Sequence, residues 1–328
     1  MTAAPATAAD QRWMGAAIAL AQRGVGRTAP NPSVGCVIVR DGRVVGRGWT
    51  QAGGRPHAEA MALAMAGAAA RGATAYVTLE PCAHVSARGP ACADLLIAAG
   101  VARVVAAVGD PDPRTDGAGL ASLAAAGIAV TAGVRAAEAE GPMAGFLSRL
   151  RRARPFITLK LAVSLDGSVA LASGESQWIT GPRARAHAHL ERARADMILV
   201  GRGTLGADNP RLDVRLAGLE DRSPLMAVMS ATDTGRPGMR HLANPAALAA
   251  VADADFVLAE GGAGLAASLV AADFVDRLLL YRAPILLGGR PALNAIGLPD
   301  LASAHGRWTP APTIDLGADR LETYFRTR

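Results

Sequence analysis

The sequence is poor in several residue types that mark common functional classes. Lys160 is the only lysine, so arginine supplies nearly all of the positive charge, and aromatic residues make up only 4% of the 328 residues. No basic run is interleaved with aromatics, which argues against a surface that stacks the bases of single-stranded nucleic acid. No apolar run is long enough to span a membrane. We therefore expect neither nucleic acid nor a membrane as a partner, and the net charge of +6 suits small phosphorylated substrates.

Cysteine is also scarce, with three in the chain, and the N-terminus shows no charged and apolar regions of a secretory signal. Such a chain is expected to be cytoplasmic and free of disulfides. Cys36 lies within the apolar run 35–39, which predicts a buried strand, and we interpret it as a core residue. Cys82 and Cys92 have a different setting, because His57-Ala58-Glu59 stands upstream of them.

One histidine and two cysteines are the donor types that a catalytic zinc site uses, with the fourth position left to water. A helical pattern starts at His57, and a strand-like run over 74–79 delivers Cys82 to the start of the next element. Helix N-termini at these positions favour thiolate over thiol, the state that zinc requires. We predict that His57, Cys82 and Cys92 bind one zinc ion and that Glu59 moves protons as a catalytic residue. The alternative is that the cysteines are core residues and the histidine is structural.

The length of the chain predicts two domains, each with a core of its own. Strands and helices alternate in the first part, which is typical of a three-layer α/β domain, and the pattern restarts over 156–163. We predict a zinc-dependent deaminase domain over 1–147, a basic linker over 148–155 and a second α/β domain over 156–328. In the second half, a strand over 256–260 leads into a glycine-rich turn and a helix. That arrangement is either a phosphate cradle or a plain tight connection.

Several longer motifs identify a family. They are Pro30-Asn31-Pro32-Ser33-Val34-Gly35-Cys36, His57-Ala58-Glu59, Thr78-Leu79-Glu80-Pro81-Cys82, Leu161 through Gly167, Gly174-Glu175-Ser176-Gln177-Trp178-Ile179-Thr180 and Ala207-Asp208-Asn209-Pro210. With them the chain resembles, over nearly its whole length, the bifunctional riboflavin-biosynthesis proteins, in which a diaminohydroxyphosphoribosylaminopyrimidine deaminase is fused to a 5-amino-6-(5-phosphoribosylamino)uracil reductase. The resemblance implies an N-terminal cytidine-deaminase-like α/β/α domain and then a dihydrofolate-reductase-like α/β domain, working with zinc and NADPH.

The reactions that the resemblance implies are the zinc-dependent hydrolytic deamination of 2,5-diamino-6-(5-phosphoribosylamino)pyrimidin-4-one and the NADPH-dependent reduction of the ribosylamino group to ribitylamino. Asn31 and His84 match positions that hold the pyrimidine. The positions that match contacts to NADPH are Ala162, Trp178, Thr204, Asp208, Ser230 and the turn of Gly262, Ala263, Gly264, Leu265, Ala266, Ala267 and Ser268. The positions that match contacts to the phosphoribosyl substrate are Ser176, Arg192, Leu212, Arg215 and Glu260.

Lys160 is a further candidate in the second half. A chain that otherwise uses arginine keeps a lysine where a compact ammonium is needed, and a charge on so apolar a strand is costly unless it is paired. We expect Asp208 to be its partner and both to be catalytic residues of the reductase, positioning ribose oxygens or helping to protonate the opening sugar. A plain buried ion pair is the alternative.

The chain departs from the family pattern in two places. The loop Ala83–Ala91 between the two cysteines is one residue longer than in many relatives, which leaves open which loop residue touches the substrate, with Arg88 a candidate. The stretch over 216–255 is shorter than expected. Rival hypotheses are a deaminase with a degenerate reductase half, an inactive paralogue and a nucleic-acid-editing deaminase, which would need a Cys-x-x-Cys spacing. The oligomeric state is open, a homo-oligomer included.

Overall fold

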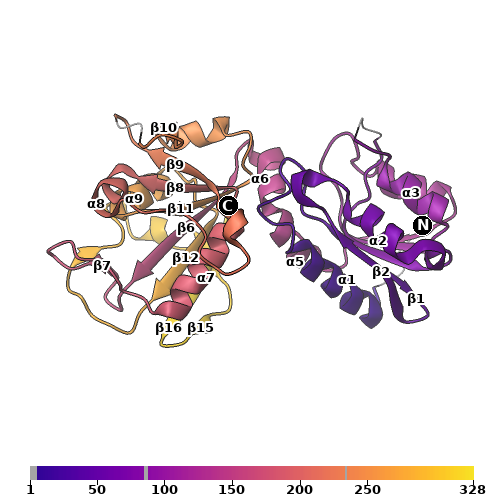
Figure 1. The fold of residues 1–328 in the computed structure, drawn as a ribbon, viewed down its shortest axis with the longest axis horizontal. Coiled ribbons are helices and arrows are strands. Elements are labelled where there is room, and N and C mark those ends of the chain that lie inside the picture. Colours follow the sequence, from indigo (N-terminus) through magenta and orange to yellow (C-terminus); the bar gives the residue numbers. More distant parts are fainter. Residues whose placement is uncertain (1–5, 85–87, 233–234) are drawn as a thin grey trace. The chain divides into compact units, whose positions relative to one another are not determined.

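The computed structural model describes residues 6–84, 88–232 and 235–328, which form two compact units (Figure 1). One unit ends at Ala153 and the other begins at Arg154. The sequence predicts a linker over 148–155. In the structure, helix α6 (Ala144–Arg152) continues through most of this stretch and belongs to the first unit. Among the helices in the described ranges, none has the length and apolar character needed to cross a membrane.

The first unit is built on one mixed sheet. Its strands are β1 (Gly35–Arg40), β2 (Arg43–Trp49), β3 (Thr74–Leu79), β4 (Arg103–Val108) and β5 (Ala129–Thr131). They lie in the order β2-β1-β3-β4-β5, and β1 pairs antiparallel with both neighbours, whereas β3, β4 and β5 are parallel. The tight turn at Asp41 and Gly42 joins β1 to β2, as the sequence predicts, with both residues at positive φ.

Helices cover both faces of this sheet, which gives the predicted three-layer α/β/α arrangement. They are α1 (Ala8–Ala21), α2 (Ala58–Ala66), α3 (Cys92–Ala99), α4 (Ala118–Ala125) and α5 (Ala136–Ala139), besides α6. Helix α1 packs on β1 and β3, and α5 packs on β3 and β4, whereas α3 packs against both α2 and α4. The apolar strands between these layers form the core.

Two glycines of β2 determine how closely α2 approaches the sheet. A Cβ at Gly46 would lie 2.2 Å from the carbonyl oxygen of Ala62, and one at Gly48 would lie 2.4 Å from that of Ala58. Only bare backbone fits under the helix at these points. Because His57 is the N-cap residue of α2, this close contact also sets the place of its imidazole.

The second unit is built on a larger, mostly parallel sheet. Its strands are β6 (Phe156–Val163), β8 (Met197–Gly201), β9 (Leu225–Met229), β10 (Arg240–Leu242), β11 (Phe256–Glu260), β12 (Arg277–Arg282), β14 (Trp308–Pro310), β15 (Ile314–Leu316) and β16 (Asp319–Arg326). The parallel run is β10-β9-β8-β11-β6-β12, and β16 then pairs antiparallel with β12, β14 and β15. The carboxyl ends of the parallel strands therefore share one edge, where open α/β sheets bind ligands.

The remaining elements connect these strands. The helices of the second unit are α7 (Pro182–Ala193), α8 (Arg202–Asp208) and α9 (Ala263–Ala271), and a separate small sheet pairs β7 (Ser168–Ala170) with β13 (Arg290–Pro291). Short 3-10 turns lie at 52–54, 67–70, 141–143, 220–222, 245–250 and 302–304. Helices α8 and α9 each start directly after a parallel strand, so their N-termini point to the carboxyl edge.

A buried ion pair holds α1 against the first sheet. Asp10 is fully buried, and its carboxylate accepts hydrogen bonds of 2.9 and 3.0 Å from the Arg103 guanidinium and one of 3.1 Å from Tyr76 Oη. Burial by itself raises the pKa of Asp10, but the hydrogen bonds from Arg103 and from Thr7 outweigh it and lower the pKa to about 2. The ionised carboxylate therefore stabilises the fold at neutral pH.

We expect Asp10→Asn to destabilise the first unit in a pH-dependent way. The folded pKa of about 2 lies below the unfolded value of 3.8, so the ionised carboxylate contributes stability above pH 3.8 that is lost as the pH falls toward 2. The variant should lose about 2 kcal/mol of unfolding free energy at neutral pH, and the gap should narrow below about pH 4. Calorimetric unfolding of parent and variant across this range measures the gap. A gap that is the same at every pH would contradict the assignment.

Candidate active sites

All three predicted zinc ligands meet in the first unit. One ligand atom from each of His57, Cys82 and Cys92 lies within 4.8 Å of the others. Nδ1 of His57 is 3.3 Å from Sγ of Cys92 and 3.7 Å from Sγ of Cys82. His57 precedes α2, Cys92 opens α3 and Cys82 follows β3, so the ends of three elements converge at one point.

The charge state of the two sulfurs fits a divalent cation. The backbone N–H of Cys92 points at Sγ of Cys82 at 3.3 Å. The pKa of the Cys82 thiol falls to about 4, chiefly because Cys92 donates a hydrogen bond to it, and that bond together with burial raises the pKa of Cys92 well above its usual range. The pair therefore carries negative charge at neutral pH, and a metal ion would displace the remaining proton. A nitrogen and two sulfurs are a donor set typical of catalytic zinc.

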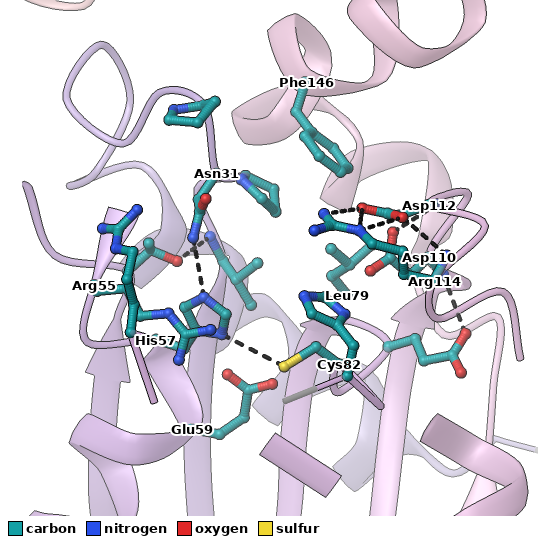
Figure 2. Close-up of a pocket in the computed structure, with 17 residues that line it drawn as sticks. Asn31, Arg55, His57, Glu59, Leu79, Cys82, Asp110, Asp112, Arg114 and Phe146 are labelled. Atoms are coloured by element: carbon teal, nitrogen blue, oxygen red, sulfur yellow. Dashed lines mark hydrogen bonds and ion pairs between the residues drawn. The ribbon is translucent and has the colours of Figure 1, made fainter. Parts of the chain in front are cut away.

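Glu59 lies beside this group without belonging to it. It is in the first turn of α2 and is 4% exposed, and Figure 2 shows its carboxylate turned toward His57 and Cys82. Burial raises the pKa of Glu59 above its usual value, which outweighs the opposing effect of His57. A carboxyl group in such a position can hold a proton near neutral pH and deliver it to a bound molecule.

A pocket of about 190 Å³ opens next to this group (Figure 2). Asn31 and His84, which the resemblance connects with the pyrimidine, both line it. Nδ2 of Asn31 donates to the carbonyl oxygen of Gly54 at 2.9 Å and lies 3.1 Å from Nε2 of His57. Nδ1 of His84 is 3.4 Å from Oγ1 of Thr115. These contacts position polar groups around a space that suits a small heterocycle.

Part of the pocket wall comes from a loop that none of the sequence motifs marks. Asp110, Asp112 and Arg114, in the loop that follows β4, line the pocket together with Arg55 and Phe146. Burial raises the pKa of Asp110 to about 6, whereas the Arg114 guanidinium lowers that of Asp112. A signal was present, because β4 is parallel to β3 and the charged stretch after it must leave the sheet beside Cys82.

The long loop between the two cysteines is described in part. Residues 85–87 lie outside the described residues. Arg88, the candidate for the basic role, lines the pocket and donates to the carbonyl oxygen of Gly53 at 2.5 Å. Arg55 lines the same pocket, and two guanidinium groups there could meet a phosphate group.

In the second unit, most of the expected cofactor residues lie at the carboxyl edge of the sheet. Ala162 is near the end of β6, Thr204 is in the first turn of α8 after β8, and Ser230 follows β9. The turn from Gly262 to Ser268 caps and opens α9 after β11. The backbone N–H of Gly262 donates to Oγ1 of Thr204 at 3.2 Å, which joins two of these segments directly.

The glycines at this edge leave room for a ligand. A Cβ at Gly203 would meet no described atom within 4 Å, and at Gly262 and Gly264 the nearest atom would be 3.9 Å away. Gly262 has an ordinary φ of −74°, so neither packing nor backbone conformation demands glycine there. Bare backbone N–H groups at a helix N-terminus suit the phosphates of a dinucleotide, and the residues present therefore fit NADPH.

The expected pairing of Lys160 with Asp208 is wrong. Nζ of Lys160 lies 3.8 Å from Oε2 of Glu260, which is its direct neighbour across the parallel strands β6 and β11. Asp208 is exposed at the end of α8. Glu260 also accepts two hydrogen bonds, of 2.7 and 3.0 Å, from Arg192. Burial raises the pKa of Glu260, but these two cations outweigh burial and lower it, so the carboxylate is ionised.

The other expected substrate contacts are more scattered. The side chain of Leu212 is buried against Ile198 and Val200, which leaves only its backbone for a ligand. Arg215 is exposed and contacts His189 through its backbone and its side chain. Ser176 and Trp178 lie in the loop before α7, where the indole of Trp178 is 65% exposed. The structure therefore joins Arg192 directly to Glu260, and Arg192 also donates to the carbonyl oxygen of Asp213, the neighbour of Leu212, at 3.0 Å.

Comparison with known proteins agrees with this division of the chain. Residues 7–108 match the cytidine and deoxycytidylate deaminase zinc-binding region, and residues 155–309 match the RibD C-terminal domain. The riboflavin biosynthesis protein RibD of Escherichia coli is 42% identical, and the match covers 90% of this chain and 94% of that protein. That of Mycobacterium tuberculosis is also 42% identical over 94% of this chain and 95% of its own. The chain belongs to the RibD family.

Solved structures support the same conclusion for the fold. RibD of Acinetobacter baumannii superposes with a TM-score of 0.86 at 36% identity and covers 98% of this chain and 99% of its own. A Thermotoga maritima protein described as a diaminohydroxyphosphoribosylaminopyrimidine deaminase and 5-amino-6-(5-phosphoribosylamino)uracil reductase gives 0.87 at 30%, covering 97% of this chain and 99% of its own. The predicted fold pair, cytidine-deaminase-like and then dihydrofolate-reductase-like, is confirmed. The chain is a deaminase and reductase of riboflavin biosynthesis.

We expect the purified protein to contain about one zinc ion per chain, because the three donors are already in place. Cys82→Ser and His57→Ala should lower the zinc content to below about a tenth of an ion per chain. Cys36→Ala is the matched control, since Cys36 is a buried cysteine of β1 and should keep the full content. Atomic absorption after gel filtration measures the metal. Equal zinc in all variants would contradict the assignment.

Proposed function

We propose that the first unit removes an amino group from a phosphoribosylaminopyrimidine by zinc-dependent hydrolysis and that the second unit reduces the ribosyl group of the product to a ribityl group with NADPH. The observation that carries the first reaction is the cluster of His57, Cys82 and Cys92 with the buried Glu59 beside it. The description of the Thermotoga maritima relative supports the choice of substrates for both reactions.

In the first reaction the protein positions the ring and moves protons. A zinc ion held by the three ligands would lower the pKa of a bound water molecule to near neutral pH. Asn31 and His84 would hold the pyrimidine in the pocket with its amino-bearing carbon toward the metal. As the oxygen of the water bonds to the amino-bearing carbon, Glu59, whose pKa is raised by burial, would take up the proton that the water loses and pass it to a ring nitrogen. It would then pass the remaining hydroxyl proton to the amino group, which leaves as ammonia when its bond to carbon breaks.

In the second reaction the protein binds and orients two molecules. NADPH supplies the hydride that reduces the sugar carbon and opens the ring. Thr204 and the N-terminal turn of α9, which are hydrogen-bonded through Gly262, would hold its phosphates. The Lys160, Glu260 and Arg192 group lies at the same edge of the sheet, where it would contact the phosphoribosyl substrate.

We also propose that both reactions take place in the cytoplasm on small phosphorylated pyrimidines, without nucleic acid as a substrate. The free state of the three cysteines is consistent with a reducing compartment. The arginines at the deaminase pocket, Arg55, Arg88 and Arg114, are suited to a phosphorylated ligand.

The test of this function follows ammonia release and NADPH oxidation separately. We expect Glu59→Gln to lower ammonia release by about a thousandfold or more while zinc stays bound, because the carboxylate moves protons and is not a ligand. The same variant should oxidise NADPH at the parental rate when it is given the already deaminated substrate. Equal losses of both activities would contradict two independent sites, and a parent enzyme that releases no ammonia would contradict the function itself.

We expect Lys160→Arg to lower reductase turnover by about tenfold, or about 1.4 kcal/mol of transition-state stabilisation. A planar guanidinium would compete with Arg192 for the oxygens of Glu260 and would not occupy the place of the compact ammonium. Deamination should stay intact. The reverse exchange at an exposed ion pair of the same unit, Arg320→Lys, is the control and should change neither activity. Steady-state NADPH oxidation checks this, and a parental rate would show that Lys160 is not needed as lysine.

A further inference from the structure

The loop 109–117, between β4 and α4, forms one wall of the deaminase pocket. Asp110, Asp112 and Arg114 lie on this wall, across the pocket from Asn31 and His57 (Figure 2). Within the loop, Asp110 Oδ1 accepts from the backbone N–H of Asp112 at 3.0 Å, and Asp112 Oδ1 accepts from that of Arg114 at 2.9 Å. These bonds shape the middle of the loop. Its two ends are held by Glu80, the residue that follows β3.

Glu80 holds both ends of the loop with one carboxylate. Oε2 accepts from the backbone N–H of Asp110 at 3.2 Å, at the start of the loop, and from that of Gly117 at 3.1 Å, at its end. Oε1 accepts from the N–H groups of Gly119 and Leu120, at 2.9 and 3.1 Å, in the first turn of α4. Glu80 is 3% exposed. The carboxylate therefore caps α4 from a distance and fixes the span of the loop.

The backbone beside Glu80 connects this clamp to the metal ligands. The N–H of Glu80 donates to the carbonyl oxygen of Val108 at 2.8 Å, which extends the pairing of β3 with β4. A Cβ at Gly119 would lie 1.9 Å from the carbonyl oxygen of Pro81, so α4 rests directly on this segment. The next residue is Cys82. One short stretch thus fixes a metal ligand with its backbone and the opposite pocket wall with its side chain.

Glu80 has no capacity left for chemistry of its own. A carboxylate offers about four acceptor sites, and four backbone N–H groups use them. The same N–H groups and the N-terminus of α4 balance its negative charge, although Asp110 lies close to it. A group that is saturated and buried in this way acts on the reaction through the atoms that it places.

We propose that Glu80 is a positioning residue for deamination, which sets the loop 109–117 at the distance from the metal site that the pyrimidine substrate needs. This inference rests on the proposed deaminase function. It assigns to Glu80 an effect on substrate binding, transmitted through Asp110, Asp112 and Arg114, and no direct contact with substrate or metal.

The test is Glu80→Gln in the full chain loaded with zinc. A glutamine amide keeps one oxygen acceptor, but its NH₂ group faces two backbone N–H donors, either those of Asp110 and Gly117 or those of Gly119 and Leu120. In both orientations the side chain no longer joins the loop to the first turn of α4. We expect KM for the pyrimidine to rise by about tenfold or more and kcat to change by less than about threefold. The zinc content and the reductase rate should equal those of the parent. Amide hydrogen exchange should become faster in peptides that cover residues 109–120 and stay unchanged in those that cover α2.

Two further variants complete the test. Glu138→Gln changes an exposed glutamate of the same unit and should leave KM and exchange unchanged. Glu80→Asp keeps the charge but shortens the side chain by one methylene, so that it cannot reach both ends of the loop, and it should also raise KM. A plain stabilising role would lower the thermal midpoint and the active fraction with KM unchanged.

The proposal is overturned if folded, zinc-loaded Glu80→Gln has a parental KM or if exchange in residues 109–120 is unaffected. It is also overturned if both Glu80 variants fail to fold, because Glu80 would then be required by the whole unit and not by the loop. A parent enzyme without deaminase activity would refute the proposed function and this inference together, whereas an active parent with an equally active variant refutes this inference alone.

Discussion

Strands β3 and β4 run parallel with Leu79 opposite Val108, so both chains leave the sheet at the same edge and in the same direction. Strand β3 continues to Cys82, which is a metal ligand, and β4 continues to the loop 109–117, which forms a pocket wall. An antiparallel pairing would send the second chain to the far edge. The position of α2 adds the histidine and the glutamate to the same edge, since its N-terminus points there. The direction of the strands thus brings the segments of the deaminase pocket together, and their side chains then give the pocket its chemistry.

Burial raises the pKa of both Glu59 and Cys82 at this edge, but hydrogen bonds overcome that effect only at Cys82. Glu59 lacks enough hydrogen-bond donors to compensate, whereas hydrogen bonds lower the pKa of the Cys82 thiol despite burial. Groups that are a few ångströms apart can then hold different numbers of protons at the same pH. In the second unit the carboxylate of Glu260 is ionised for a comparable reason, because Lys160 and Arg192 face it.

The metal ligands could be predicted from the sequence because each stands where a periodic pattern begins or ends. One histidine and two cysteines are also the donor types that a catalytic zinc site uses. Strands with a strong apolar pattern, such as β3 and β4, could also be predicted from the sequence. Contacts between residues that are far apart in the sequence could not be predicted. The partner of Lys160 depends on which strand lies beside β6 and in which register, and only the folded sheet brings Glu260 and not Asp208 next to it. Helix α6 was mistaken for a linker because its basic residues hide the buried face that packs on the first unit.

The border between the two units also separates the residues of the two sites along the chain. Phe146, on α6, lines the deaminase pocket, and the helix ends at Arg152, just before the border at Ala153 and Arg154. The residues assigned to deamination all precede that border, and those assigned to reduction all follow it. The residues of the two sites therefore lie in two consecutive segments of the chain that meet at a single border. A break between residues 148 and 152 would cut through α6, the helix that carries Phe146 of the deaminase pocket.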